Sequence, residues 1–157
     1  MDSMEKLHDW MDIALEFSWV PWSLSLVYLG GIHFGQQLML NHTEFDLKPI
    51  LFLWNLSLTV FSFVGFFKTF PAVVSIFPET CRVRLDEQAA TWLTLFMLSK
   101  VPELFDTLFL VLRKKEVKFL HYFHHSSVLV YSWTAYASRS PIGIYFTTMN
   151  LGVHSIM

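Results

Sequence analysis

The stretch PILFLWNLSLTVFSFVGFF, residues 49–67, contains no Asp, Glu, Lys or Arg and lies between Lys48 and Lys68. Its length is close to the roughly 20 residues that an α-helix needs to cross the hydrocarbon core of a bilayer. Residues 17–43 and 140–157 are likewise free of these four residue types. Such repeated uncharged runs are typical of membrane-spanning helices, so the sequence predicts a fold shaped by lipid.

The composition of the whole chain supports this interpretation. Hydrophobic residues make up 54% of the 157 residues, aromatics reach 17%, and charged residues only 15%, against about 25% in soluble domains. These values exclude a soluble domain and a disordered segment, and the single cysteine, Cys81, excludes a disulfide scaffold. A net charge of −2 gives no basic surface for nucleic acid.

The sequence predicts an all-α integral membrane protein, a polytopic helical bundle forming one domain over residues 1–157. About five spans are expected, at residues 19–40, 49–67, 88–112, 119–138 and 141–157. A shorter apolar piece, residues 69–77, is expected in the next loop or as an extension of the second span. Because the last uncharged run reaches Met157 with no polar flank, we expect the chain to be incomplete.

Basic residues predict the orientation in the membrane, because they collect on the cytosolic side. The two predicted sides carry equal numbers of Lys and Arg, but the turn at residues 113–118 is the densest cluster. This turn, with Arg113, Lys114, Lys115 and Lys118, is therefore expected in the cytosol. The sequon at Asn41 then lies on the cytosolic side, so we expect no glycan there.

Three ionisable side chains fall within the third predicted span: Lys100, Glu103 and Asp106. Their spacing would place them on one face of a continuous helix. Charges inside a span are costly and mark functional sites. They would neutralise one another, either as a stripe that fixes helix packing or as part of a site. Pro102 should loosen the helix between them.

The fourth predicted span opens with HYFHH, residues 121–125. This spacing gathers His121, His124 and His125 on one helical face. Two interpretations remain open: the imidazoles hold a metal such as zinc or iron, or one acts as nucleophile or base while its neighbours set its tautomer. The fifth span adds Asn150 and His154, four residues apart.

Together these residues resemble the ELO family of very-long-chain fatty acid elongases. KVPELFDT, residues 100–107, is similar to its KxxExxDT box; FLHYFHH, residues 119–125, to its LHxxHH box; and NLGVHSIM, residues 150–157, to the start of its NxxxHxxMYxYY box. The order and spacing are also those of the family. The residues flanking the boxes look closest to the branch acting on saturated and monounsaturated long-chain acyl-CoA.

The resemblance implies a multi-pass protein of the endoplasmic reticulum with seven spans, six of which form a helical barrel around an acyl tunnel. The implied reaction is a decarboxylative Claisen-type condensation of a long-chain acyl-CoA with malonyl-CoA, giving 3-oxoacyl-CoA, CoA and CO2 without cofactor or metal. The reductases and dehydratase of the elongation cycle are implied as partners, and a homo-oligomer is left open. Because the third box stops at Met157, the chain alone is expected to be inactive.

The same resemblance assigns roles to the histidines. His124 would carry the acyl group as an acyl-imidazole, and His154 would lie opposite it near the reacting centre. His121 and His125 would orient and tune His124 or form part of a relay. Cys81 is expected in a lumenal loop away from the motifs, so imidazole replaces the cysteine that soluble condensing enzymes commonly use.

The other candidate site residues are charged or polar. Glu103 and Asp106 would fix imidazole tautomers, and Lys100 would offset their charge or meet a thioester or carboxylate. Substrate contacts are expected from Asn150, Thr107, Arg113, Lys114, Lys115 and Lys118. For the four basic residues we expect contact with the CoA phosphates; the alternative is that they serve only as a signal of membrane orientation.

Two other kinds of protein fit part of the pattern. A di-iron membrane desaturase or hydroxylase also contains HxxHH, but it uses several histidine boxes and has no place for KxxExxDT. A non-enzymatic membrane transporter would explain charges that line a pathway, but not three histidines at this spacing.

Overall fold

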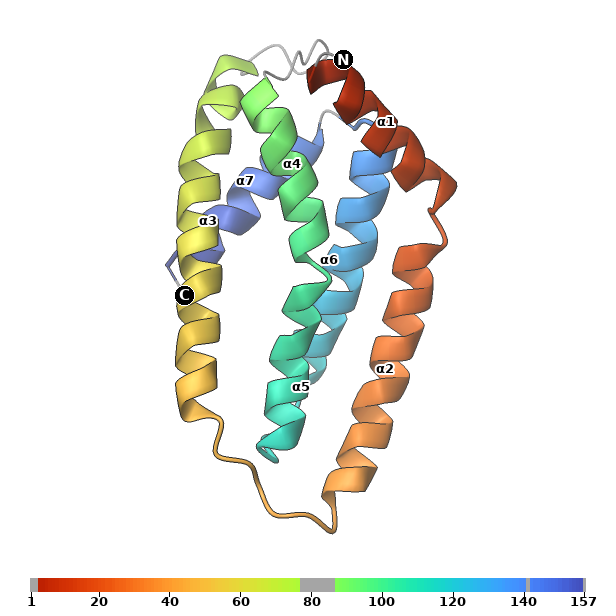
Figure 1. The fold of residues 1–157 in the computed structure, drawn as a ribbon, viewed down its shortest axis with the longest axis vertical. Helices are drawn as coiled ribbons and strands as arrows, with labels where there is room; N and C mark the ends of the chain where they lie inside the picture. Colours follow the sequence, from red (N-terminus) through yellow and green to blue (C-terminus); the bar gives the residue numbers. More distant parts are fainter. Residues whose placement is uncertain (1–2, 77–86, 141, 157) are drawn as a thin grey trace.

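The computed structural model describes residues 3–76, 87–140 and 142–156. Cys81 and Met157, which figured in the sequence analysis, lie outside these residues. The described residues form helices joined by short connecting segments, and they contain no strand. This confirms the all-α class. Their elements, in chain order, are α1 (Ser3–Glu16), α2 (Val20–Met39), α3 (Lys48–Ile76), α4 (Glu87–Ser99), the 3-10 helix η1 (Pro102–Leu104), α5 (Phe105–Leu112), α6 (Phe119–Ala137) and α7 (Ile142–His154) (Figure 1).

Several helices follow the apolar runs closely. α2 and α6 begin and end within two residues of the first and fourth predicted spans. α3 is longer than residues 49–67, because the next apolar piece continues the same helix to Ile76 despite Pro71 inside it. Large apolar side chains of α2 and α3, including Leu26, Phe34 and Phe52, face outward, as is expected of helices that contact lipid.

The third predicted span, residues 88–112, is a broken helix rather than a continuous one. α4 ends at Ser99, and η1 and α5 follow after two turn residues. At the break, Lys100 N donates to Met97 O at 3.4 Å and Val101 N to Leu98 O at 3.3 Å, both over three residues instead of four. Pro102 has no N–H, and its ring obstructs the preceding turn, so the first sequence box lies across a helix break.

Hydropathy and length single out one described helix that can cross a membrane by itself, at Lys48–Ser75. A second candidate joins Asp9–Glu16 to Val20–Met39 across a bend of 56°. α4, α5 and α7 are shorter than a span. The number of five spans therefore stays a prediction.

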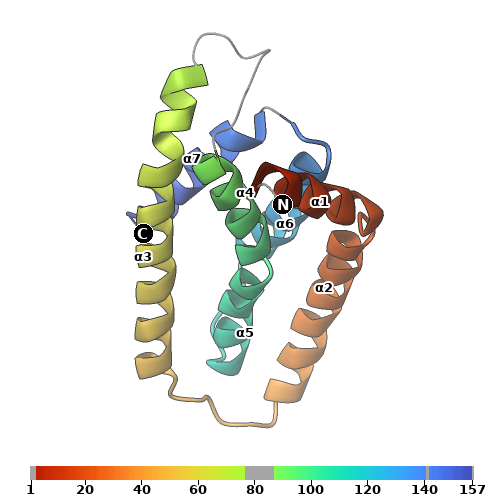
Figure 2. The ribbon, with the colours of Figure 1, turned by 45° about the horizontal axis from the view of Figure 1, so that its top comes forward.

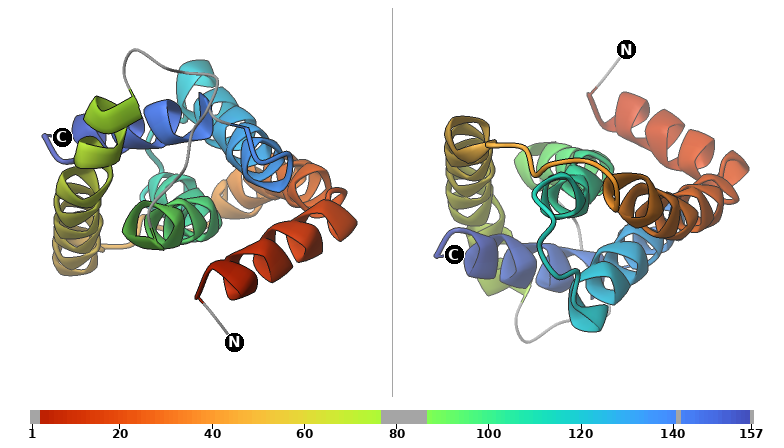
Figure 3. Two further views of the ribbon diagram at one scale, coloured as in Figure 1. Left: turned by 90° about the horizontal axis from the view of Figure 1, so that it is seen from above. Right: turned by 90° about the horizontal axis from the view of Figure 1, so that it is seen from below.

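The helices pack around α4, which contacts α1, α3, α6 and α7 (Figure 3). α7 crosses α3 obliquely, and α2 packs on α5 and α6. Figure 2 shows α2 and α3 on either side of α5. At the end where these three helices meet the connecting loops, Phe45 N donates to Leu112 O at 3.1 Å and Lys114 Nζ to Leu40 O at 3.4 Å.

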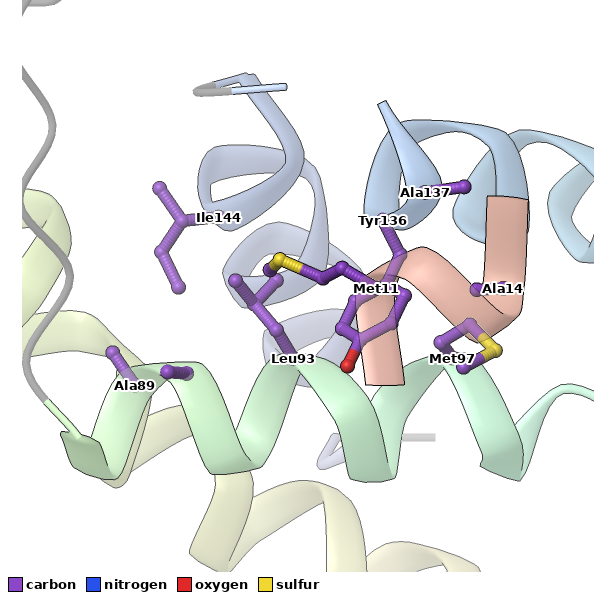
Figure 4. Packing of buried hydrophobic residues seen from close by; sticks show 9 residues of the cluster. Met11, Ala14, Ala89, Leu93, Met97, Tyr136, Ala137 and Ile144 are labelled. Atoms are coloured by element: carbon purple, nitrogen blue, oxygen red, sulfur yellow. The ribbon is translucent and has the colours of Figure 1, made fainter. Parts of the chain in front are cut away.

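The apolar core fills the opposite end of the bundle. Met11 of α1, Leu93 and Met97 of α4, Tyr136 of α6 and Ile144 of α7 are all buried there (Figure 4). Two polar contacts also tie α1 to α6: Trp133 Nε1 donates to Ala14 O at 2.9 Å, and Arg139 Nη2 pairs with Asp12 Oδ1 at 2.7 Å. The motif residues on α4–α6 lie farther along the helices, away from this core.

Candidate active site

A buried ion pair occupies the break after α4. Lys100 Nζ lies 2.7 Å and 2.8 Å from the two carboxylate oxygens of Glu103, and Ser99 Oγ donates to Oε1 at 3.1 Å. Nζ also donates to Asn150 Oδ1 at 3.0 Å and lies 4.2 Å from the ring centroid of Phe96. Both charges of the pair therefore have further polar or aromatic contacts, from Ser99, Asn150 and Phe96. The bond to Asn150 connects the first sequence box to the third.

Asp106 does not join this pair among the described residues. Trp54 Nε1, from α3, donates to Asp106 Oδ1 at 2.5 Å, while Oδ2 lies 3.9 Å from His125 Nε2. Lys100 and Glu103 thus pair directly, whereas Asp106 takes its hydrogen bond from α3. The helix that carries the three is interrupted around Pro102, and Asp106 faces α3 and α6.

Thr107 is completely buried between two helices. Its Oγ1 lies 2.5 Å from Tyr28 OH of α2 and 2.9 Å from His121 Nε2 of α6. The two hydrogen bonds use a hydroxyl that otherwise would be unsatisfied in an apolar interior.

The three histidines of α6 gather as their spacing predicts. The ring centroids of His121 and His125 are 4.5 Å apart, and those of His124 and His125 are 5.7 Å apart. His125 is buried, whereas His124 is exposed. In the part of the chain that the structure describes, the rings of His124 and His154 have no hydrogen-bond partner. Both rings are free to meet a ligand.

A cleft of about 850 Å³ runs along these histidines, within the usual size range of small-molecule sites. Its walls come from α3, α5, α6 and α7, with Arg113 at the end of α5. The apolar lining residues are Leu51, Leu58, Leu110, Phe146, Met149 and Val153; the polar ones are Asn55, Thr59, Asp106, Arg113, His121, His124, His125, Asn150 and His154. Polar residues outnumber apolar ones in this lining, but apolar atoms make up most of its surface, and such a cleft suits an elongated apolar ligand with a reactive end.

The structure separates the residues that the sequence analysis grouped together. Of the predicted site residues, those on the cleft wall are His121, His124, His125, His154, Asp106, Asn150 and Arg113. Lys100 and Glu103 lie buried behind the wall, as does Thr107. Lys114, Lys115 and Lys118 are exposed on the turn after α5, outside the cleft lining. Arg113 is therefore the cation of this turn that faces the cleft.

Sequence reasoning did not single out Tyr28, Trp54, Asn55 or Thr59. The amide of Asn55 inside an apolar span was a usable signal, but it also fits ordinary bonding between helices. Tyr28 and Trp54 carry no such signal, because the chain is rich in aromatics throughout. Their hydrogen bonds to Thr107 and Asp106 became visible only in the fold.

The metal interpretation has no geometric support in the described parts of the chain. Within residues 3–76, 87–140 and 142–156, no three His, Cys, Asp or Glu side chains are arranged to hold a metal ion.

The outward-facing apolar helices and the histidine-lined cleft define a helical membrane protein with a polar site between its helices. Residues 13–157 match the ELO family, described as the GNS1/SUR4 family, and the chain belongs to that family. The resemblance inferred from the three boxes is thereby confirmed.

Individual relatives agree with the family match. The chain is 40% identical over 141 residues to very long chain fatty acid elongase 6 of Drosophila melanogaster, covering 84% of this chain and 43% of the relative. It is 39% identical over 141 residues to the human protein of the same name, covering 85% and 53%. Long chain fatty acid elongase 2 of Caenorhabditis elegans is 36% identical over 151 residues, covering 89% and 55%. The chain spans about half the length of these relatives, and no solved structure matches it significantly.

Proposed function

We propose that this chain supplies the reacting centre of a fatty acid elongase, which condenses a long-chain acyl-CoA with malonyl-CoA. The observation that carries the proposal is the pair of histidines, His124 and His154, whose rings have no hydrogen-bond partner in the described residues and line one cleft from two helices. The names of the relatives, all elongases, support the reaction class.

In the first half-reaction His124 is the nucleophile. A lone pair of its neutral imidazole attacks the thioester carbonyl, the carbon–sulfur bond breaks, and CoA leaves as the thiol with the imidazole proton. The acyl-imidazole that results is activated for attack by a carbanion. The apolar residues of the cleft would hold the acyl chain for the second half-reaction.

In the second half-reaction malonyl-CoA supplies the carbanion. Loss of CO2 leaves an enolate, which forms a carbon–carbon bond to the acyl carbonyl. The bond to the imidazole then breaks, and the ring regains from solvent the proton that it lost with CoA. The products are 3-oxoacyl-CoA, CoA and CO2, and no external base or redox partner is needed. His154, on the same cleft, would act near the reacting carbonyl.

The remaining polar residues would position substrates or helices. Arg113 lines the cleft and suits the malonyl carboxylate or a CoA phosphate, while the exposed Lys114, Lys115 and Lys118 suit the outlying phosphates. Asp106, 3.9 Å from His125, is too far for a direct hydrogen bond and would favour one tautomer of that ring through its charge. The Lys100–Glu103 pair would hold the helix break against Asn150.

The setting that we propose is the endoplasmic reticulum membrane, crossed several times, with the turn at residues 113–118 in the cytosol where CoA esters are found. The reductases and dehydratase that process a 3-oxoacyl-CoA would be the functional partners. Neither metal nor cofactor has a part in the proposed steps.

Product analysis tests this function. The chain is expressed as a chimaera in which it replaces the matching segment of the Drosophila relative, and the purified protein receives acyl-CoA and labelled malonyl-CoA. We expect 3-oxoacyl-CoA two carbons longer than the acyl substrate. Release of labelled CO2 without this product, or no turnover by a folded chimaera, would reject the proposal.

The nucleophile is tested by intact-mass measurement after acyl-CoA alone. The unsubstituted chimaera should gain one acyl group and His124→Ala should gain none, with condensation lost by several orders of magnitude. Acylation that persists in His124→Ala would assign the nucleophile elsewhere. The 157 residues alone should not condense, since His124 is exposed in the described structure and water would hydrolyse an acyl-imidazole there.

A further inference from the structure

A line of three hydrogen-bonding side chains crosses the bundle behind the cleft. Tyr28 of α2 contacts Thr107 of α5 at 2.5 Å, and Thr107 contacts His121 of α6 at 2.9 Å. Thr107 is wholly buried, and Tyr28 is partly buried. Tyr28 belongs to none of the three sequence boxes, yet it is one hydroxyl away from a histidine of the cleft wall.

The chemistry of the three groups indicates which of them donates and which accepts in each hydrogen bond. A threonine hydroxyl has one proton to donate and can accept two hydrogen bonds. A phenolic hydroxyl is the better donor of the two hydroxyls, so Tyr28 donates to Thr107. The single proton of Thr107 can then go to His121 Nε2, which accepts it only as the unprotonated nitrogen.

We propose that Tyr28 is a positioning residue that, through Thr107, holds His121 as the neutral tautomer with its proton on Nδ1. Nε2 of His121 is thereby occupied and cannot serve as nucleophile or base. Because His125 is buried, covalent chemistry is left to His124, whose ring is exposed and has no hydrogen-bond partner among the described residues. His121 faces the cleft as a fixed hydrogen-bond donor. The consequence for catalysis rests on the proposed function; the tautomer assignment does not.

The chain contains a matched control for Tyr28. Tyr136 of α6 is a buried tyrosine whose hydroxyl, like that of the partly buried Tyr28, bonds a threonine, at 2.8 Å from Thr94 Oγ1. It belongs to the apolar core at the other end of the bundle. Tyr136→Phe removes the same kind of hydrogen bond from the same kind of pair. It should leave His121 unaffected.

The first measurement needs no substrate. Diethyl pyrocarbonate carbethoxylates unprotonated, accessible imidazole nitrogens, and mass spectrometry of peptides gives a separate rate for His121 and His124. The 157-residue chain in lipid nanodiscs is compared with Tyr28→Phe, Tyr136→Phe, Thr107→Val and Thr107→Ser at one pH. Elution volume and circular dichroism establish that each variant is folded.

We expect Tyr28→Phe and Thr107→Val to raise the rate at His121 by roughly two- to tenfold, the factor for the loss of one hydrogen bond. Thr107→Ser keeps the hydroxyl and should stay near the parent rate, as should Tyr136→Phe. An unchanged rate in both Tyr28→Phe and Thr107→Val would overturn the proposal. So would equal increases at all histidines, which would indicate general loosening.

Kinetics of the chimaera give the second measurement. Because Tyr28 lies outside the cleft lining, Tyr28→Phe should lower kcat by about tenfold and leave KM for both CoA esters unchanged. A rise in KM alone would show that Tyr28 shapes the binding cleft instead. If the parent chimaera does not condense, the proposed function fails, while the carbethoxylation result still decides the role of Tyr28.

Discussion

Asp106 and Thr107 are neighbours in the chain, but their side chains leave α5 in different directions. Successive side chains on an α-helix are rotated by about 100°, so Asp106 meets Trp54 of α3 and Thr107 meets Tyr28 of α2. Thr107 also hydrogen-bonds His121, and Asp106 Oδ2 lies 3.9 Å from His125 Nε2, beyond hydrogen-bond length. At the scale of residues, two aromatic side chains of α2 and α3 hold the polar groups that stand beside the imidazoles of α6.

Trp54→Phe should impair function more than folding. The substitution removes the indole N–H that Asp106 Oδ1 accepts and frees the carboxylate to move from His125. We expect condensation by the chimaera to fall by about tenfold or more, in line with the ~1.5–3 kcal/mol of a hydrogen bond to a charged group. Steady-state kinetics and the thermal midpoint in detergent measure the two effects.

Trp133→Phe is the matched control. Trp133 donates its indole N–H to Ala14 O at 2.9 Å, at the end of the bundle that holds the apolar core. The substitution should lower the thermal midpoint and leave kcat near that of the parent. If the two variants lose activity equally, Trp54 has no special relation to the site.

At the scale of elements, the break between α4 and α5 decides which groups meet. A continuous helix would have lined up Lys100, Glu103 and Asp106. With the helix interrupted before Pro102, Lys100 meets Glu103 and Asn150 of α7, and Asp106 faces α3 and α6. α4 and α7 both pack closely on α3, and Gly65 of α3 lies where they meet.

Gly65→Ala should destabilise this packing. A Cβ at position 65 would lie 2.9 Å from ring atoms of Trp92 on α4 and 3.1 Å from Leu151 Cδ1 on α7. These contacts are too short for carbon atoms, and a half-buried indole has little room to move, so we expect a loss of about 1–3 kcal/mol. Thermal unfolding in detergent micelles measures it.

Gly30→Ala supplies the comparison. Gly30 lies inside α2, and a Cβ at this position would have no atom within 4 Å. Alanine favours helix over glycine by about 0.5–1 kcal/mol, so the midpoint should hold or rise. A Gly65→Ala variant as stable as Gly30→Ala would contradict the packing of α3, α4 and α7.

At the scale of the whole molecule, the bundle has two distinct ends. The loop after α2 and the turn after α5 meet at one end, joined by Phe45 and Lys114. α1 and the end of α6 meet at the other, joined by Arg139 and Asp12. If the helices cross the membrane, the two ends lie on opposite sides of it.

Cysteine labelling in sealed microsomes tests this arrangement. In a Cys81→Ser background, single cysteines replace the exposed residues His42, Lys115 and Ser138. His42→Cys and Lys115→Cys should react with an impermeant maleimide at once, and Ser138→Cys only after permeabilisation. Protection of either of the first two, or a glycan on Asn41, would overturn the proposed orientation.

What the sequence determined by itself was everything that depends on neighbours along the chain. Apolar runs located α2 and α6, and the 3.6-residue period gathered His121 and His125, because backbone hydrogen bonds fix positions within one helix. The three boxes identified the family. The partners across helices were decided only by the tertiary structure: Tyr28 for Thr107, Trp54 for Asp106, Asn150 for Lys100, and Arg113 rather than the lysines at the cleft. Those pairings depend on how each helix is rotated and where it breaks, and that is set by packing between helices distant in the sequence.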